Sequence, residues 1–291
     1  MRRIIRAAIL GFWGLWGLLT LPADAAEYRL DFVAASHASL DNPHDLKLSP
    51  DGKHLFVADV GNNRVAILDA EHLSFVAAFG DDHQSGTHDV DFDAQGRAYV
   101  ADTHNNRVTV YEMDGFKARL VGKLSARIRG PEGVLAHANG RIYVAGAWSG
   151  NLVAFENGKI VAELTGLSLP HDVENAPGGD IWLAEAGNDR MLLVSPDLVI
   201  KKELKGPPYN FDGVRYQDVL ADGTLIAADK NNHQVKVIGP DGKLVAVLGT
   251  GQPGKGKRLF RTPEGIEVRG DTLWISDSGN DRVVKYRIQR H

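Results

Sequence analysis

The sequence has no cysteine among its 291 residues. This absence excludes disulfide bonds, thiol catalysis, thiolate metal sites, thioether-linked haem and lipoprotein anchoring, all of which need a cysteine sulfur. The fold must therefore be held by buried apolar side chains and by pairing between its elements. A chain of this length can form one domain with a substantial core.

Positive charge is not concentrated anywhere in the sequence. The 33 Lys and Arg residues are outnumbered by 37 Asp and Glu residues, for a formal net charge of −4. Because no basic block is present to neutralise a run of phosphates, we expect no nucleic-acid partner. No amphipathic helical period is evident beyond residue 25 either. These absences favour a mildly acidic protein built from strands and turns.

One long apolar run lies near the amino terminus. It covers 7–21, about 15 residues, whereas a membrane-spanning helix needs ~20. Three arginines precede the run, Pro22 ends it, and the small-x-small segment Ala23-Asp24-Ala25 follows. The pattern predicts a signal peptide over 1–25 and a mature domain over 26–291, with periplasmic or secreted localisation and no stable membrane insertion after cleavage. An uncleaved anchor is the alternative.

A short segment recurs six times in the predicted mature chain. The copies over 57–65 (VADVGNNRV) and 100–108 (VADTHNNRV) differ at only two positions. Equivalent positions lie at 59, 102, 146, 185, 229 and 277, a spacing of 39 to 48 residues. Each repeat contains a first strand, an Asx-Gly type of turn, a buried strand, a polar corner and two further strands. The pattern predicts an all-β fold, a six-bladed β-propeller of four-stranded blades.

The last repeat lacks its outer strand. After Asp277 only the strand over 283–288 remains, whereas an unassigned strand lies over 28–33. We expect this amino-terminal strand to complete the last blade and close the ring, because closure leaves no long sheet edge exposed. We expect the closed ring to be a monomer.

The polar corners are accompanied by characteristic openings of the repeats, such as Pro43-His44-Asp45 and Pro131-Glu132-Gly133. In these openings and in its Asp/Glu-x-x-Asn-x-Arg corners, the whole mature chain resembles the NHL-repeat family. The resemblance implies a six-bladed propeller. It does not fix the function, because that family includes enzymes, ligand-binding modules and protein-interaction platforms.

The residues that open the repeats are expected to form a ring, since the first strand of each propeller blade lines the central channel. At one register the ring holds His44, His88, Glu132, His171, Asp212 and Glu264. The fifth position stays open. Asp212 lies 17 residues before its corner, whereas the others lie 13 to 15 before theirs, and Arg215 or Gln217 could stand there instead.

Imidazole and carboxylate groups around one axis are good ligands for a divalent metal. Histidine nitrogen suits zinc or another transition metal, whereas calcium prefers oxygen ligands and fits less well. We therefore expect one divalent metal at the ring, with a polar funnel that orders water as the alternative. Asp45, Asp89 and Asp172 follow the three histidines. We expect them on the opposite strand face, bonded to the backbone of a neighbouring blade.

Departures from the repeat are further candidates for ligand binding. The third corner has Trp148 where other corners are polar, and the loop before the fifth repeat carries Tyr209 and Phe211. Arg129 and Arg261 precede the third and sixth repeats and could form a cationic entrance. We expect a small molecule, peptide or protein to bind at this channel mouth. Plain scaffold or surface roles are the alternative for each of these residues.

Nothing in the sequence decides between binding and catalysis. A binding propeller of the cell envelope is our first hypothesis, and a metal-dependent lyase or hydrolase is the alternative. The enzyme that the chain resembles most is peptidyl-α-hydroxyglycine α-amidating lyase. That resemblance implies zinc held by three channel histidines, with a Tyr and an Arg assisting, although His44, His88 and His171 lie on repeats one, two and four rather than on alternating ones. A calcium-dependent lactonase would require a ring of mostly Glu, Asn and Asp.

Overall fold

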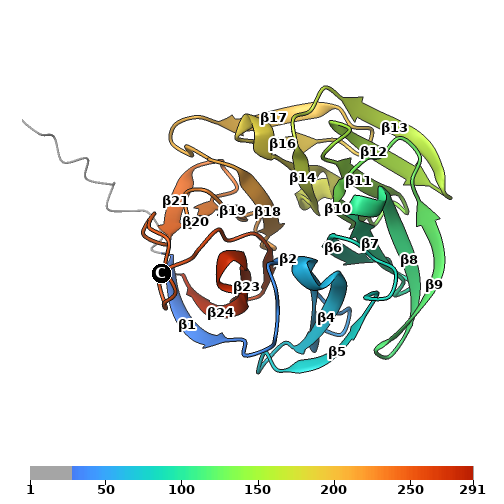
Figure 1. The fold of residues 1–291 in the computed structure, drawn as a ribbon. Coiled ribbons are helices and arrows are strands. Elements are labelled where there is room, and N and C mark those ends of the chain that lie inside the picture. Colours follow the sequence, from blue (N-terminus) through green and yellow to red (C-terminus); the bar gives the residue numbers. More distant parts are fainter. Residues whose placement is uncertain (1–27, 291) are drawn as a thin grey trace, which may run out of the picture.

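The computed structural model describes residues 28–290 and is a ring of six four-stranded antiparallel sheets around a central axis (Figure 1). The predicted all-β, six-bladed propeller is confirmed. The predicted signal peptide lies outside the described residues. Within the described part, no helix is long and apolar enough to cross a membrane.

The first three blades follow one another along the chain, each from its innermost to its outermost strand. Blade one comprises β2 (Pro43–Leu48), β3 (His54–Asp59), β4 (Arg64–Asp69) and β5 (Phe75–Phe79). Blade two comprises β6 (Thr87–Phe92), β7 (Ala98–Asp102), β8 (Arg107–Asp114) and β9 (Lys117–Leu124). Blade three comprises β10 (Pro131–Ala136), β11 (Ile142–Gly146), β12 (Asn151–Glu156) and β13 (Lys159–Thr165).

The last three blades continue the same order, and only the sixth uses a strand from elsewhere in the chain. Blade four comprises β14 (Pro170–Asn175), β15 (Ile181–Glu185), β16 (Arg190–Val194) and β17 (Ile200–Lys205). Blade five comprises β18 (Val214–Val219), β19 (Leu225–Asp229), β20 (Gln234–Ile238) and β21 (Leu244–Leu248). Blade six comprises β22 (Ile266–Arg269), β23 (Thr272–Asp277), β24 (Arg282–Gln289) and β1 (Arg29–Ala35). Single 3-10 turns are η1 (Val60–Asn62), η2 (Thr103–Asn105), η3 (Pro177–Gly179), η4 (Ala186–Asn188) and η5 (Ser278–Asn280).

The ring is closed as the sequence predicts, because β1 pairs antiparallel with β24. The Phe32 ring meets Tyr286 edge to face, with ring centroids 5.7 Å apart. Ser36 extends the seam, since its Oγ accepts a hydrogen bond from the Val283 amide at 3.0 Å. The chain thus completes its last blade with its first strand, and apolar side chains fill the spaces between successive blades.

The recurring corners hold each blade to the next. Asp59 is fully buried and accepts hydrogen bonds from Asn62 Nδ2 at 2.9 Å and Arg64 Nε at 2.8 Å. Asn63 adopts a left-handed φ of 53°, and its Oδ1 accepts a hydrogen bond from the Gly86 amide of blade two. The same acid–Asn–Arg contacts recur around Asp102, Glu185 and Asp277. This geometry agrees with a scaffold role for the corners.

Candidate functional site

Three layers of polar side chains fill the channel, and they come from the inner strands of the blades and, for Glu264, from the segment just before β22. The entrance layer is His44, His88, Glu132, His171, Arg215 and Glu264. The middle layer contains Asp45, Asp89, Asp172 and Tyr216. The far layer is Lys47, Asp91, Glu174, Asp218 and Glu267. We call the entrance layer the histidine ring.

A local irregularity brings two successive side chains of a strand into the channel. In β2 the pairing with β3 shifts between Pro43 and Leu46, and β6 and β14 shift at the equivalent place. A bulge of this kind breaks the alternation of a regular strand. The prediction that Asp45, Asp89 and Asp172 lie on the face opposite the histidines is therefore wrong, since they form the layer beneath the ring.

One half of the histidine ring has unsatisfied polar atoms. It consists of Glu264, His44 and His88, on the neighbouring blades six, one and two, and each is at most 8% exposed. His44 Nε2 lies 3.8 Å from Glu264 Oε1, and the rings of His44 and His88 stand edge to face, 4.5 Å apart. Both oxygens of Glu264 and Nδ1 of His44 lack a hydrogen-bond partner. A buried carboxylate without hydrogen bonds is costly even when cations lie beside it, so this half of the ring is suited to receive a ligand.

The other half of the ring is internally paired. Glu132 Oε2 lies 2.5 Å from His171 Nε2, and the guanidinium of Arg215 contacts the same imidazole. Arg215 therefore takes the fifth ring position that the sequence left open. Asp212 lies outside the ring, where it is exposed and accepts a hydrogen bond from Asn231 at 2.9 Å.

Two cations balance the two carboxylates of the ring. Lys230, in the corner of blade five, places Nζ 2.5 Å from Glu264 Oε1, although not in hydrogen-bond geometry. Arg215 Nε lies 3.8 Å from Glu264 Oε2. Burial and the neighbouring His88 hold the pKa of His44 well below its usual value, and burial lowers that of His88. Both imidazoles are therefore neutral at pH 7 and able to act as ligands or proton acceptors.

Two ring histidines are oriented by hydrogen bonds to the backbone. His88 Nδ1 lies 2.9 Å from the Gly86 carbonyl, and His171 Nδ1 lies 3.0 Å from that of Leu169. Each carbonyl must accept a proton from Nδ1. In neutral His88 this leaves Nε2 as an acceptor, whereas Nε2 of His171 donates to the Glu132 carboxylate. Burial would raise the pKa of Glu132, but the charge and hydrogen bond of His171 outweigh it and hold that pKa well below the usual range.

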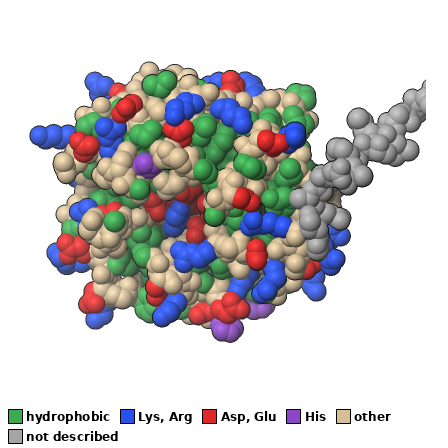
Figure 2. Space-filling model, turned by 180° about the vertical axis from the view of Figure 1, so that it is seen from behind, with side chains coloured by type: hydrophobic (Ala, Val, Ile, Leu, Met, Phe, Trp, Pro, Cys, Tyr) green, Lys and Arg blue, Asp and Glu red, His purple; other side chains and the backbone are tan. Residues whose placement is uncertain are grey.

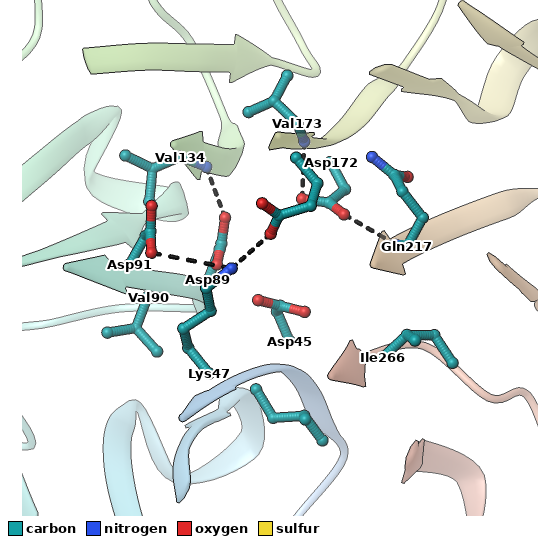
Figure 3. Close-up of a pocket in the computed structure, with 12 residues that line it drawn as sticks. Asp45, Lys47, Asp89, Val90, Asp91, Val134, Asp172, Val173, Gln217 and Ile266 are labelled. Carbon is teal, nitrogen blue, oxygen red and sulfur yellow. Dashed lines mark hydrogen bonds and ion pairs between the residues drawn. The ribbon is translucent and has the colours of Figure 1, made fainter. Parts of the chain in front are cut away.

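The middle layer closes the channel beneath the ring. Tyr216 is fully buried, and its hydroxyl lies 3.1 Å from the Glu132 carbonyl. Asp89 and Asp172 accept hydrogen bonds from amides of the following blade, those of Val134 and Gln217. The predicted bonds to neighbouring backbone are thus present for these two residues. Figure 3 shows these bonds, and it draws none to Asp45. The enclosed cavity here is about 10 Å³, roughly the space of one water molecule.

The far layer is strongly acidic around a single lysine. Lys47 pairs with Glu174 and lies 3.9 Å from Asp91 and 4.0 Å from Glu267. Figure 3 shows the Lys47 ammonium beside Asp91, and Figure 2 shows acidic and basic side chains gathered at the centre of one face of the molecule. Burial raises the pKa of Asp91 and of Asp218 to about 7. Among the described residues, Lys47 is therefore the only cation that offsets the four carboxylates of the far layer. These belong to Asp91, Glu174, Asp218 and Glu267.

The five predicted ligand-binding residues divide into two groups. Trp148 is 46% exposed on the rim of blade three, and Arg129 and Arg261 are exposed on loops that lead into blades three and six. Tyr209 and Phe211 instead stack on each other, 5.7 Å apart, and pack against the core between blades four and five. Phe211 is only 6% exposed, but it lines a surface cleft together with Lys205 and Asn210. Its role in ligand binding stays a prediction.

Lys230 was not predicted from the sequence, although a signal for it exists. It follows the corner residue Asp229, a position where the other repeats have Val60, Thr103, Ala147, Ala186 and Ser278. A lysine among small or uncharged residues at a repeat position close to the channel indicates a local function. Within residues 28–290, no three His, Asp or Glu side chains stand ready as a set of metal ligands.

Comparison with known proteins supports the fold and little more. A family model described as a lactonase, 7-bladed beta-propeller, matches residues 23–145. No curated protein matches the sequence. The chain is therefore placed among β-propellers, without a narrower family.

Solved structures similar to this chain are also propeller-like over most of its length. A virginiamycin B lyase from Staphylococcus aureus is 14% identical with a TM-score of 0.63, over 90% of this chain and 99% of that one. An auxiliary nutrient binding protein from Bacteroides ovatus is 16% identical with a TM-score of 0.70, over 91% of this chain and 77% of that one. A protein of unknown function from Bacteroides thetaiotaomicron is 13% identical with a TM-score of 0.74, over 90% and 76%. At these identities the likeness concerns the fold alone.

Proposed function

We propose that this chain is an exported binding propeller of NHL-repeat type, and that its histidine ring binds a small anionic molecule together with one divalent transition metal. The observation that carries the proposal is the Glu264 carboxylate, which is 1% exposed and lacks a hydrogen bond at either oxygen. Lys230 and Arg215 contact this carboxylate as charges only, and a metal ion or a ligand would give its oxygens a directed partner. The nutrient binding protein from Bacteroides ovatus supports a binding function for this fold.

The donor set of the unsatisfied half-ring suits zinc. His44, His88 and Glu264 would hold the metal, and when bound it would polarise an oxygen of the ligand. Ligand atoms of a tetrahedral zinc site are roughly 3.3 Å apart, given zinc–nitrogen bonds of about 2.0 Å. The His44 Nε2 to Glu264 Oε1 distance is 3.8 Å, so a small side-chain adjustment would bring these two ligands together. The hydrogen bond that orients His88 is typical of metal-binding histidines.

The cations beside this half of the ring would hold the anionic group of the bound ligand. Lys230 and Arg215 both face Glu264, and a metal that binds Glu264 would displace them from that carboxylate. They would then be free to pair with a ligand carboxylate next to the metal. The site would recognise the ligand by charge while the neutral histidines hold the metal.

Zinc titration into the metal-free protein, followed by isothermal titration calorimetry at pH 7.5, tests the metal site. We expect one equivalent to bind, and we expect Glu264→Gln and His88→Ala to lower the affinity by about 100-fold or more, because each removes a ligand. His72→Ala is the matched control, since that histidine is on the surface. Because burial lowers the pKa values of His44 and His88, binding should persist to a lower pH than at a site made of exposed histidines. Equal affinities in all four proteins would refute the site.

A metal-dependent lyase or hydrolase is the second candidate. It is favoured by the presence of Arg215 and Tyr216 beside the three histidines, which are the residue types implied by the resemblance to peptidyl-α-hydroxyglycine α-amidating lyase. The Staphylococcus aureus lyase is described as catalytically inactive in a variant where a histidine is replaced by alanine. Product formed from a peptidyl-α-hydroxyglycine by the zinc-loaded protein, and lost in Tyr216→Phe, would favour the lyase over the binding function.

A further inference from the structure

A surface cleft of about 510 Å³ lies where the corner of blade four meets the loop between blades four and five. This volume is within the range of roughly 300–1,000 Å³ that is usual for small-molecule sites. None of the lining residues belongs to the histidine ring. They include Asn188, Asp189, Lys205, Asn210 and Phe211, and we call the site the blade-four cleft.

Asp189 brings a negative charge to this cleft that the scaffold does not require. It adopts a left-handed φ of 51°, and its Oδ1 accepts a hydrogen bond from the Gly213 amide of blade five at 2.7 Å. Asn63 and Asn106 occupy the same position in blades one and two, and each makes the same bond to the following blade with an amide oxygen. An amide therefore suffices for the link between blades, whereas the carboxylate adds a charge and a second charged oxygen.

Lys205 brings the opposite charge to the adjoining wall. It is exposed at the end of β17, directly across from Arg190 in the pairing of β16 with β17, and Asp189 immediately precedes that arginine. Arg190 itself pairs with Glu185 and Glu203. Within residues 28–290, Asp189 and Lys205 form no ion pair with each other or with another side chain. Two neighbouring opposite charges of the cleft are thus available to a ligand.

The loop side of the cleft is held in place by packing. Phe211 stacks on Tyr209, with ring centroids 5.7 Å apart and ring planes at 8°, and Lys236 Nζ lies 5.0 Å from the Phe211 centroid. Lys236 also donates a hydrogen bond to the Asn210 carbonyl at 2.9 Å. The cleft therefore combines two opposite charges with an apolar edge and the side-chain amides of Asn188 and Asn210.

We infer that the blade-four cleft binds a small zwitterion, which is an α-amino acid or the two charged ends of a short peptide. The ligand ammonium donates to the Asp189 carboxylate, and the ligand carboxylate accepts from the Lys205 ammonium, so both contacts are charge-assisted. A ligand with one charge is attracted by one of these residues and repelled by the other. An apolar side chain of the ligand lies against Phe211. The site goes beyond the proposed function, because it uses no residue of the histidine ring.

Calorimetric titration of the metal-free protein with leucine, 4-methylpentanoate and isopentylamine tests the inference. The second compound lacks the ammonium of leucine, and the third lacks its carboxylate. We expect leucine to bind about tenfold or more tightly than either, since each analogue loses a hydrogen bond between charged groups. Leucylglycine distinguishes the two sources of the zwitterion. Tighter binding than leucine assigns the cleft to peptides, and weaker binding assigns it to free amino acids.

Single substitutions locate the binding in the cleft. Asp189→Asn keeps an oxygen for the bond to Gly213 but removes the charge, so it should lower the leucine affinity about tenfold or more and leave the melting temperature unchanged. Lys205→Met should lower the affinity to a similar extent. Asp281→Asn is the matched control, because Asp281 occupies the equivalent position in blade six, where its Oδ1 accepts from the Asn42 amide at 2.9 Å. Its leucine affinity should equal that of the unmodified protein.

Glu264→Gln separates this inference from the proposed function. It removes a proposed metal ligand of the histidine ring and should leave leucine binding unchanged. Leucine binding that is lost in Glu264→Gln but kept in Asp189→Asn would place the ligand in the ring and overturn the inference. Equal binding of leucine and its two analogues, equal leucine affinities of Asp189→Asn and Asp281→Asn, or no leucine binding at all would also overturn it. None of these results would bear on the zinc titration.

Discussion

Lys47→Met should lower the melting temperature by about 10 °C at pH 8, because it leaves four buried carboxylates without a counter-charge. Lys47 is 21% exposed, pairs with Glu174 and lies within 4.0 Å of Asp91 and Glu267. Removing one partner of a buried ion pair costs about 3–5 kcal/mol. In a domain of this size each kcal/mol corresponds to roughly 2–4 °C in melting temperature.

The drop in melting temperature caused by Lys47→Met should become smaller as the pH falls. Burial raises the folded-state pKa of Asp91 and Asp218 to about 7, above the ordinary value of 3.8, and raises that of Glu267 well above its usual range. A carboxyl whose pKa is raised by folding contributes stability that is present at low pH and is lost as the pH rises through the folded-state value. Without Lys47 the carboxylates repel more strongly at pH 8, and protonation relieves this by pH 5. Lys47 itself stays charged throughout, since its pKa is raised above 10.5.

Melting curves at pH 5, 6, 7 and 8 would check this prediction. Lys53→Met is the matched control, because Lys53 belongs to the same blade but its side chain is 77% exposed. Its melting temperature should follow the unmodified protein within about 1–2 °C. A Lys47→Met variant that melts with the unmodified protein at pH 8 would show that the far layer does not hold charged carboxylates around this lysine.

A disulfide across the closing seam should raise the melting temperature by about 10–20 °C. Asp31 in β1 and Arg287 in β24 are direct partners in the antiparallel pairing, and the chain has no cysteine to compete. An Asp31→Cys/Arg287→Cys bond would close a loop of about 250 residues, for which chain entropy sets an upper gain of about 5 kcal/mol. The gain would convert to melting temperature at roughly 2–4 °C per kcal/mol. The bond would act on the pairing of β1 with β24, by which the first strand of the chain completes blade six.

Calorimetry with and without reducing agent would measure the effect of this bond. The reduced double variant and the two single variants provide the controls, and they should melt close to the unmodified protein because both side chains are at the surface. Equal melting temperatures for the oxidised and reduced double variant would contradict closure of the ring by β1.

The repeat predicted the architecture because each copy carries its own turn and corner. Asp59 and its equivalents recur with the same Asn and Arg partners, so the number and order of blades follow from the spacing alone. The closing strand followed from counting strands at the two ends. Five of the six predicted ring residues also lie in the ring, since they occupy the same place in their repeats.

Other features of the site depend on contacts that no single repeat contains. The bulge that turns Asp45 into the channel results from the irregular pairing of β2 with β3. The alternation of a regular strand predicts instead that Asp45 points away from the channel. Arg215 rather than Asp212 takes the ring position of blade five. The inner strand of that blade reaches the channel three residues later than the sequence of the preceding loop suggests. The division of the ring into a paired and an unsatisfied half arises from the side-chain contacts of Glu132, His171 and Arg215. Sequence spacing gives the order of the blades but not these contacts.

Anomalous diffraction at the zinc edge from crystals of the zinc-loaded protein tests the central claim most directly. The account predicts one strong peak at the entrance of the channel, bounded by His44, His88 and Glu264, with Lys230 turned away from Glu264. A histidine ring without a peak, while zinc is seen only at surface residues such as His72, would contradict it.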